Sequence, residues 1–372
     1  MGNRIRILHA ADLHLDSPFD GLDEEKAALR RAEQRETLRR IAEYAVMAKA
    51  DLVLLAGDLL DGDGVFRETG ESLCAALGGI SAPVFIAPGN HDPYTPGCVY
   101  DTLALPENVH VFKSRAIECA ELPEKGVRVW GAAFTDKFEQ GLLRGFEAEK
   151  QDSVLDIMVM HGDVGAPKSV YNPISEEDMR RSGMDYIALG HVHTFSSLCR
   201  AGDTYYAYPG CAEGRGFDEC GEKGVIIAEV SEEGVQARFV PVCSRRYEEL
   251  NVDLSNVPDG ADALDALEAV LPGDTENDIY RITFTGSAAA APDLKSVRSR
   301  LEGRFFSLRL RDRTSMRRDV WEKCGEDTLR GLFLTKLRRL YDAAGSDDER
   351  ERITLAARYG LAALENGEAP AM

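Results

Sequence analysis

Residue types that bind divalent metal ions recur in five short motifs between residues 12 and 193. Their side chains are carboxylates, imidazoles and one amide, which hard and borderline divalent ions accept as ligands. Two such ions held about 3.5–4 Å apart polarise a phosphoryl group and activate the attacking water. The motif residues are Asp12 and His14, Asp58, Asn90 with His91 and Asp92, His161, and His191 with His193. The sequence therefore predicts a metal centre assembled from distant segments.

Each motif directly follows an apolar run that is typical of a buried strand. The runs are Ile5–Leu8, Leu52–Ala56, Val84–Ala87, Val154–Met160 and Tyr186–Leu189. In open α/β sheets, the residues beyond the carboxyl ends of the strands meet in one crevice. Side chains alternate along an extended chain, so the outer residues of Asp-x-His and His-x-His point the same way. We therefore expect the five segments to converge on one rim.

A single motif of this kind has a simpler explanation, because an isolated Asp-x-His is more commonly a surface accident or a hydrogen-bonded pair. Here five of the seven histidines belong to the set, and only His9 and His110 lie outside it. His9 is expected to be a packed histidine at a strand end. A non-catalytic binding scaffold would not need the whole set, so the pattern favours an enzyme.

The wider pattern predicts an α/β fold, a layered β-sandwich flanked by helices. A long helix is expected over Glu24–Ala48. Further strands are expected over Val127–Phe134, Thr204–Tyr208, Gly224–Val230 and Val235–Val240. These elements would form a catalytic domain over residues 1–245.

The pattern restarts near Arg246. Strands over Glu249–Leu254, Ile279–Thr285 and Phe305–Leu310, with helices over Ala261–Val270 and Leu294–Leu301, predict a small α/β cap domain at 246–318. Beyond Asp319 only helical signals remain. Residues 319–372 are therefore expected to form C-terminal helices, a partner-binding segment.

The five motifs resemble, in order, those of the calcineurin-like metallophosphoesterases, over roughly residues 5–240. The resemblance implies the metallophosphoesterase fold with two divalent metal ions, and Mn²⁺ as the metal. The ligand types alone leave Fe²⁺, Zn²⁺ and Mg²⁺ open. One ion would be held by Asp12, His14, Asp58 and His193, and the other by Asp58, Asn90, His161 and His191, with Asp58 bridging.

The remaining candidate site residues lie beside these ligands. His91 is placed to donate a proton to the leaving 3′-oxygen or to stabilise the transition state. Asp92 is expected to orient His91 by accepting its other N–H, the alternative being a turn residue before Pro93. Arg215 is a candidate for substrate binding through a phosphate, or else a surface arginine. Asp16 either reaches the site through water or caps a loop.

Two stretches resemble bacterial DNA repair exonucleases of the SbcD group, in particular its YhaO-type branch. They are His9–Phe19 and the loop from Tyr208 to Gly224. This resemblance implies DNA as substrate, with Mn²⁺-dependent 3′→5′ exonuclease and single-strand endonuclease activity. The alternative is a metal-dependent phosphoesterase acting on small nucleotides or phosphoproteins, because such enzymes share the motifs. End preference, DNA structure preference and oligomeric state stay open.

The charge pattern bears on the substrate in two opposing ways. The chain of 372 residues has a net charge of −20, which opposes binding to a polyanion. The segment Arg281–Leu340, however, has 15 basic against 7 acidic side chains, a net +8. This segment is either a surface that faces DNA or a solvated face that balances acidic neighbours.

Cysteine spacing and hydropathy point to a cytoplasmic protein without a membrane segment. The eight cysteines form no C-x-x-C pair, so neither a zinc ribbon nor a disulfide framework is expected, and only Cys211 and Cys220 bracket one loop. No run of eighteen apolar residues occurs. The N-terminus leads straight into the first strand, which leaves no room for a signal peptide.

The C-terminal segment has two apolar stripes at helical spacing. One contains Leu329, Phe333, Leu337 and Leu340, and the second helix is expected to open with a capping box at Ser346–Glu349. The stripes pack against each other, on the chain's own catalytic domain or on another protein. The resemblance implies that they bind the coiled coil of an SMC-like (SbcC-type) ATPase, and it leaves a homodimer open.

Overall fold

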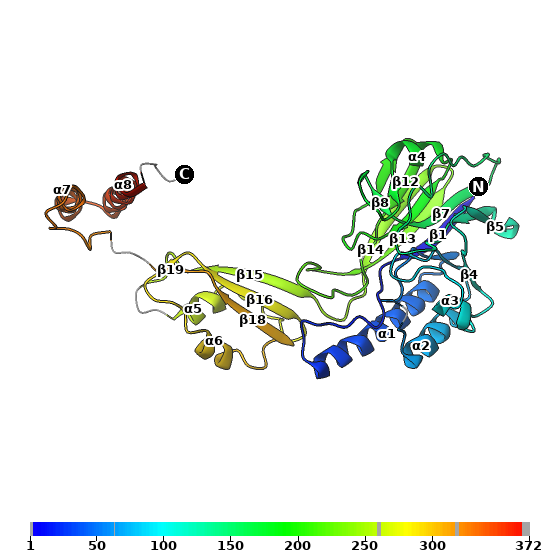
Figure 1. The fold of residues 1–372 in the computed structure, drawn as a ribbon, viewed down its shortest axis with the longest axis horizontal. Helices are drawn as coiled ribbons and strands as arrows, with labels where there is room; N and C mark the ends of the chain where they lie inside the picture. The colour runs from blue at the N-terminus through cyan, green and yellow to red at the C-terminus, as the bar shows by residue number, and fades with distance from the viewer. Residues whose placement is uncertain (1–2, 63, 259–261, 317–319, 367–372) are drawn as a thin grey trace. The chain divides into compact units, whose positions relative to one another are not determined.

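The computed structural model describes residues 3–62, 64–258, 262–316 and 320–366 (Figure 1). The chain groups into two compact units. The first comprises 1–249, 273–281 and 302–309, and the second 250–272, 282–301 and 310–372. The second unit thus joins most of the expected cap with the expected helical segment. The division into three domains at 245 and 318 stays a prediction.

Two six-stranded sheets form the first unit. The first sheet has the order β14 (Gly234–Pro241), β13 (Gly224–Ser231), β1 (Arg4–Ala10), β2 (Leu52–Leu55), β3 (Val84–Ile86), β4 (Val109–Val111). The second has the order β11 (Cys199–Ala201), β12 (Thr204–Ala207), β10 (Tyr186–Gly190), β7 (Leu155–His161), β6 (Val127–Gly131), β5 (Glu118–Leu122). Strands β1 to β4 pair in parallel, as do β6, β7, β10 and β12. The motif-bearing strands of each sheet therefore end at the same edge.

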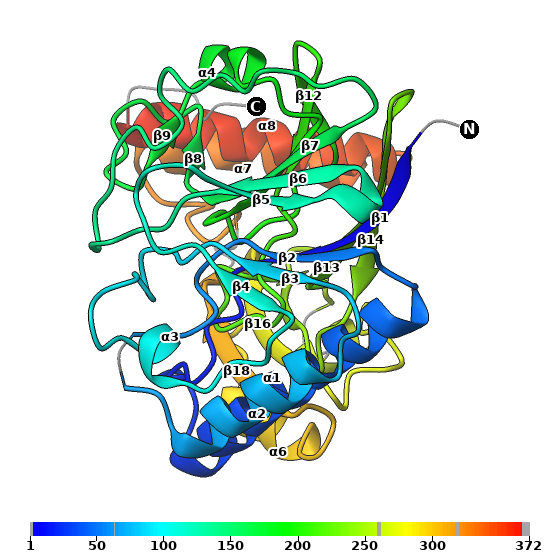
Figure 2. The ribbon, with the colours of Figure 1, turned by 90° about the vertical axis from the view of Figure 1, so that its right-hand side faces the viewer.

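The two sheets pack face to face on an apolar core, and Figure 2 shows them as adjacent layers. Ile7 and Leu54 come from the first sheet, and Val129 and Ile157 come from the second. All four are buried. Successive side chains of a strand point to opposite faces, so β1 places Ile7 in this core and Leu8 in the next layer.

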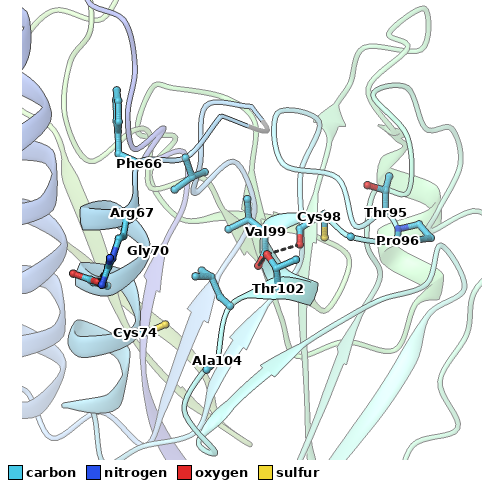
Figure 3. Close-up of a pocket in the computed structure, with 14 residues that line it drawn as sticks. Phe66, Arg67, Gly70, Cys74, Thr95, Pro96, Cys98, Val99, Thr102 and Ala104 are labelled. Carbon is cyan, nitrogen blue, oxygen red and sulfur yellow. Dashed lines mark hydrogen bonds and ion pairs between the residues drawn. The ribbon is translucent and has the colours of Figure 1, made fainter.

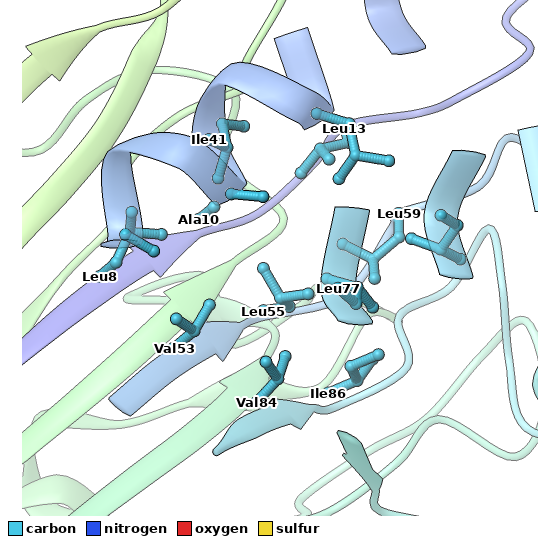
Figure 4. Packing of buried hydrophobic residues seen from close by; sticks show 14 of the residues in the cluster. Leu8, Ala10, Leu13, Ile41, Val53, Leu55, Leu59, Leu77, Val84 and Ile86 are labelled. Atoms are coloured by element: carbon cyan, nitrogen blue, oxygen red, sulfur yellow. The ribbon is translucent and has the colours of Figure 1, made fainter. Parts of the chain in front are cut away.

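Helices cover the outer face of each sheet. On the first sheet, α1 (Glu24–Met47) and α2 (Arg67–Gly78) bury an apolar stripe against Leu8, Val53 and Leu55 (Figure 4). On the second, α4 (Glu176–Arg181) contributes Met179 to a separate cluster. The Asp23 side chain caps α1 by accepting the Lys26 N–H. This arrangement confirms the predicted layered β-sandwich flanked by helices.

Three strands of the sandwich, β4, β5 and β11, were not predicted, and the predicted strand that is shortened most is β6. Strand β4 has only three residues, and β5 is an exposed edge strand of mixed polarity. Neither has an apolar run or a clear alternation, which are the local signals of a strand. Strand β6 ends at Gly131 rather than Phe134.

The strands β15 (Tyr247–Asp253), β16 (Ile279–Thr285) and β18 (Ser307–Asp312) form a three-stranded sheet. Each of these strands has residues in both units. The second unit contains α5 (Ala263–Glu268), α6 (Leu294–Arg300), α7 (Leu329–Ala343), α8 (Asp347–Asn366) and the strand pair β17 (Ser287–Ala288) and β19 (Ser315–Met316). Shorter elements of the first unit are α3 (Val99–Thr102), β8 (Asp163–Val164), β9 (Pro173–Ile174) and a 3₁₀ turn at Pro123–Lys125. Among the described residues, no helix combines the length and the apolar character needed to cross a membrane.

Helices α7 and α8 pack on each other. Leu334 and Ala357 are fully buried, and Gly360 leaves room for the ring of Phe333. Leu329 is 71% exposed, although the predicted stripe includes it. The buried face of α7 is thus turned relative to the expected one, because packing against α8 selects Leu334.

Candidate metal centre

The five motifs come together at the carboxyl ends of β1, β2, β3, β7 and β10, as predicted. Asn90 Oδ1 lies 3.0 Å from His161 Nε2 and 3.0 Å from His191 Nδ1. His14 Nε2 lies 3.2 Å from His193 Nε2, although these two histidines are 179 positions apart in the chain. The ligating atoms of distant segments therefore share one small volume.

The two buried aspartates complete two neighbouring groups of ligands. Asp12 Oδ1 is 3.6 Å from His193 Nε2. Asp58 Oδ2 is 3.8 Å from His14 Nε2 and 3.4 Å from His161 Nε2. Asp58 therefore lies between the two groups of histidines, which is the position of a bridging ligand.

The side chains that are present fit two divalent ions. Ligating atoms lie within 4.8 Å of one another in three groups, which are Asp12–His14–His193, His14–Asp58–His91 and Asp58–His161–His191. The first group contains three of the four residues expected to hold one ion, and lacks Asp58. The third group, with the amide oxygen of Asn90, contains the four residues expected to hold the other. Carboxylate, imidazole and amide donors at this density need a cation to offset their charge and satisfy their lone pairs.

Burial sets the protonation of the candidate ligands. It lowers the pKa of His14 and of His191 to about 4, so both imidazoles are neutral at pH 7 and offer a lone pair. Burial also disfavours the charged form of His161, but the adjacent Asp58 carboxylate outweighs this and raises the His161 pKa to about 9. Burial raises the pKa of Asp12 to about 6. Burial and the neighbouring carboxylates therefore set the protonation of these candidate ligands together.

Four candidate ligands have a left-handed backbone, which residues other than glycine rarely adopt. Their φ angles are 52° at Asp12, 43° at His14, 51° at Asp58 and 108° at His191. Each such residue costs about 1–3 kcal/mol and persists only where its surroundings enforce it. Two backbone hydrogen bonds do so here, from Asp12 N to Gly57 O at 3.0 Å and from His14 N to Asp58 O at 2.9 Å. This strain turns the side chains inward at the strand ends.

Glycines in the motifs allow the strand ends to approach closely. A Cβ atom on Gly89 would collide with the carboxylate of Asp58, and one on Gly190 would collide with the carbonyl oxygen of Ala56. In the Gly-Asp, Gly-Asn-His and Gly-His motifs, the glycine therefore allows close packing of the backbone, and the residues after it supply the candidate ligands.

The carboxylate that contacts His91 belongs to Asp61, a residue that the sequence motifs did not single out. His91 Nδ1 lies 2.8 Å from Asp61 Oδ1, and the His91 side chain is 43% exposed. The hydrogen bond from His91 to Asp61 raises the pKa of His91. The expected contact between Asp92 and His91 is corrected by this geometry, since Asp61 takes that place.

Asp92 instead holds the loop that carries the ligands. Its buried carboxylate accepts the hydroxyl of Tyr100 and the backbone N–H groups of Asp58, Leu59, Leu60 and Gly89. These donors come from the segments after β2 and β3. Asp92 therefore fixes the backbone on which Asp58 and Asn90 sit.

Replacing Asp92 with alanine is expected to lower the free energy of unfolding by about 3–5 kcal/mol, because five buried donors lose their acceptor. Urea denaturation of the purified variant measures this. Asp203→Ala is the matched control, since that side chain is fully exposed and its loss should change stability by less than about 0.5 kcal/mol. Unchanged stability with slower turnover would instead return Asp92 to the predicted catalytic role.

Replacing Asp61 with asparagine is expected to lower turnover by about 10–100-fold, because His91 loses the carboxylate that orients it. Steady-state kinetics on a small phosphodiester measure the effect. Because Asp61 Oδ1 also lies 3.4 Å from His14 Nδ1, the same change in a His91→Ala background should still lower turnover, but by less than in the wild type. Additive losses in the double variant would mean that Asp61 acts independently of His91.

A second unpredicted carboxylate, Glu219, holds His193 and Arg215. Glu219 Oε1 lies 2.6 Å from His193 Nδ1 and 2.9 Å from Arg215 Nη2. Burial opposes the charge of Glu219, but these two partners hold its pKa well below the usual range. Arg215 Nη1 is also 3.9 Å from Asp61 Oδ1. Arg215 thus lies beside the candidate metal centre, and its role in substrate binding stays a prediction.

Hydrogen bonds define the roles of His9 and Asp16. His9 is buried, with Nδ1 2.9 Å from the Tyr186 hydroxyl and Nε2 3.0 Å from the Leu189 carbonyl oxygen, so it is the packed histidine. Asp16 accepts the N–H of Phe66 at 2.8 Å and the hydroxyl of Thr69 at 2.7 Å. Asp16 therefore caps the loop and first turn of α2. All eight cysteines are free thiols, as expected.

A cavity of about 720 Å³ lies beside α2 and α3, away from this chemistry (Figure 3). Phe66, Cys74, Cys98 and Leu103 are among its lining residues. Among the described residues that line it, none is a candidate ligand. The polar groups that could act on a substrate lie instead around Asp61 and Arg215.

Comparison with known proteins identifies the family. The model of the calcineurin-like phosphoesterase family matches residues 5–195, which include all five motifs. The chain belongs to this family. The metallophosphoesterase assignment agrees with the sandwich, the strand-end motifs and the grouped ligands described above.

Three curated relatives resemble this metallophosphoesterase. The uncharacterized metallophosphoesterase YhaO of Bacillus subtilis (strain 168) is 31% identical over 68% of the chain and 64% of the relative. The DNA double-strand break repair protein Mre11 of Aeropyrum pernix is 27% identical over the same shares. A component of the nuclease SbcCD of Rhodobacter capsulatus is 34% identical over 24% of the chain and 22% of that protein. The chain thus spans less than two thirds of the length of each relative.

Proposed function

We propose that this metallophosphoesterase is a two-metal-ion phosphodiesterase that hydrolyses DNA. It would act as a 3′→5′ exonuclease and single-strand endonuclease of DNA repair in the cytoplasm, with Mn²⁺ at both positions. The observation that carries the proposal is the placement of Asp58 between the ligands of two adjacent groups. The names of the Mre11 and SbcCD relatives support DNA as the substrate.

In this proposal the residues of the site have three roles, which are metal binding, proton donation and phosphate binding. Asp12, His14, Asp58 and His193 would hold one ion, and Asp58, Asn90, His161 and His191 the other. The bound ions polarise the phosphoryl oxygens and lower the pKa of an attacking water. His91 is exposed toward solvent, is oriented by Asp61 and would donate a proton to the leaving oxygen. Arg215 would bind a phosphate oxygen with its guanidinium.

A nuclease assay tests the proposal directly. The full chain is incubated with end-labelled duplex and hairpin DNA, with bis(p-nitrophenyl) phosphate and with a phosphopeptide, in Mn²⁺ and in Mg²⁺. Shortening of the DNA from its 3′ ends in Mn²⁺, together with hydrolysis of the small diester, is the expected result. Turnover of the phosphopeptide or of small nucleotides without DNA cleavage would favour the alternative phosphoesterase. Metal analysis of the purified protein should find two ions per chain.

The C-terminal helices are proposed to bind an SMC-like ATPase. Leu329, Leu332 and Leu340 on α7 are 71%, 63% and 54% exposed, and Leu355 and Leu364 on α8 are 50% and 42% exposed. At 3.6 residues per turn, the three leucines on α7 lie within about 80° of one another, so they form one apolar stripe that a partner helix can cover. Leu355 and Leu364 lie on opposite sides of α8.

Replacing Leu329 and Leu332 together with aspartate should abolish co-purification with a co-expressed SbcC-type ATPase by placing charge in the apolar contact. Thermal stability should change little, because both side chains are exposed. Lys336→Gln on the same helix is the control. A large drop in melting temperature would show that the leucines support the chain's own fold. A shift from dimer to monomer in sedimentation would instead indicate a homodimer contact.

A further inference from the structure

A second cavity, of about 550 Å³, adjoins the candidate metal centre. Asp61 and Arg215 form its wall on the side of the centre. Arg281 at the start of β16 and Arg309 on β18 lie in the lining as well, together with the ring of Phe217. All of these residues belong to the first compact unit. The cavity therefore extends from the reacting groups to two further arginines.

Phe217 holds the two outer guanidinium groups in place. The Cζ atom of Arg281 lies 4.4 Å from the Phe217 ring centroid, and that of Arg309 lies 5.5 Å from it. The ring itself packs edge-on against Tyr247, with centroids 5.1 Å apart. Arg309 also donates a hydrogen bond to the carbonyl oxygen of Gly21. A guanidinium group that is already stacked on a ring loses less side-chain conformational entropy when it binds a ligand. This favours recognition of an acceptor that presents two oxygens.

The charges around the cavity are balanced. Asp20 and Asp218 line it with Asp61, and Arg281 forms an ion pair with Glu249. A triphosphate or a phosphomonoester dianion would be repelled by these carboxylates. A phosphodiester carries a single negative charge, and a guanidinium can bind its two free oxygens in bidentate geometry. This balance of charges favours a singly charged backbone diester over a more highly charged phosphate ligand.

We propose that this cavity binds a second backbone phosphate of a polynucleotide whose scissile phosphate lies at the metal centre. Arg309 and Arg281 are the donors to that phosphate, and Phe217 positions them. The inference rests on the proposed function, which it sharpens. The preferred substrate is an oligonucleotide with at least two phosphodiesters rather than a single diester.

Methylphosphonate scanning tests the site. In a fluorescently labelled eight-residue oligothymidylate, one phosphate at a time is replaced by a neutral methylphosphonate. Binding to the full chain is measured by fluorescence anisotropy with Ca²⁺ in place of Mn²⁺. For the wild type, neutralising one phosphate away from the scissile position should weaken binding by about 10-fold or more, the value of a charge-assisted hydrogen bond.

Arg309→Gln and Arg281→Gln should each weaken binding of the unmodified oligonucleotide and remove the penalty at that one position. Arg309→Lys keeps the positive charge but loses the planar guanidinium that can donate two parallel hydrogen bonds, so it should retain only part of the affinity. Arg200→Gln, at an exposed arginine paired with Asp203, is the matched control and should behave like wild type. Unaltered melting temperatures establish that the variants fold.

The two ideas fail in different ways. If wild-type protein with Mn²⁺ hydrolyses neither DNA nor bis(p-nitrophenyl) phosphate, the proposed function is wrong, and anisotropy still decides the cavity. If the methylphosphonate penalty persists unchanged in Arg309→Gln and in Arg281→Gln, or if no position shows a penalty, the cavity does not bind a second phosphate.

Discussion

Asp58→Asn is expected to remove metal and activity together. Asp58 lies between both ligand groups, with its carboxylate 3.8 Å from His14 Nε2 and 3.4 Å from His161 Nε2. Asparagine keeps the shape and one oxygen but loses the charge that two cations share. Metal catalysis contributes several kcal/mol, so hydrolysis of bis(p-nitrophenyl) phosphate should fall by about 10³-fold or more.

Mass spectrometric metal analysis of the Asp58→Asn protein should show fewer than two ions per chain. The variant should stay folded, because the side chain that replaces Asp58 can still accept the His91 backbone N–H. Asp203→Asn at a fully exposed carboxylate controls for the loss of one negative charge. Wild-type turnover with both ions retained would eliminate the assignment of Asp58 as the bridge.

His91→Ala separates chemistry from metal binding. His91 is 43% exposed and contacts Asp61 at 2.8 Å, whereas His14 and His161 are fully buried among the ligands. Removal of a general acid typically slows a reaction by about 10²–10⁴-fold. We therefore expect turnover of the small diester to fall by that factor while two ions remain bound.

His110→Ala is the control for the loss of an imidazole, because His110 packs against Phe112 and lies outside the motifs. It should leave turnover unchanged. The decisive measurement is the metal content of the His91 variant. Loss of an ion would make His91 a ligand, as its grouping with His14 and Asp58 permits, and would overturn the division of roles.

The path of the loops around the site could not be predicted from the sequence. Asp61 and Asp92 are both acidic residues near a strand end, and little in the local sequence shows which of them contacts His91. In the structure Asp92 is buried under the backbone N–H groups of Asp58 and Gly89, so Asp61 is the carboxylate that reaches His91. The spacing of Asp61 three residues after Asp58 was the available signal, and Glu219 in the Gly-rich loop offered a weaker one.

In the C-terminal helices too, the sequence did not predict which residues are buried in the tertiary contact. The spacing of apolar residues located α7, but the fully buried position is Leu334 rather than Leu329. A stripe at helical spacing identifies an amphipathic helix, whereas the partner surface selects which side of the stripe is buried.

The sequence by itself determined the sandwich and the set of candidate ligands. Buried parallel strands are continuous apolar runs, and residues that follow them must meet at the carboxyl edge of the sheet, so local pattern and topology suffice. The tertiary structure alone decided which carboxylate supports which histidine, and it brought Arg215, Arg281 and Arg309 to one cavity. Those contacts join segments that are far apart in the chain, and side-chain reach and loop geometry, rather than sequence periodicity, determine them.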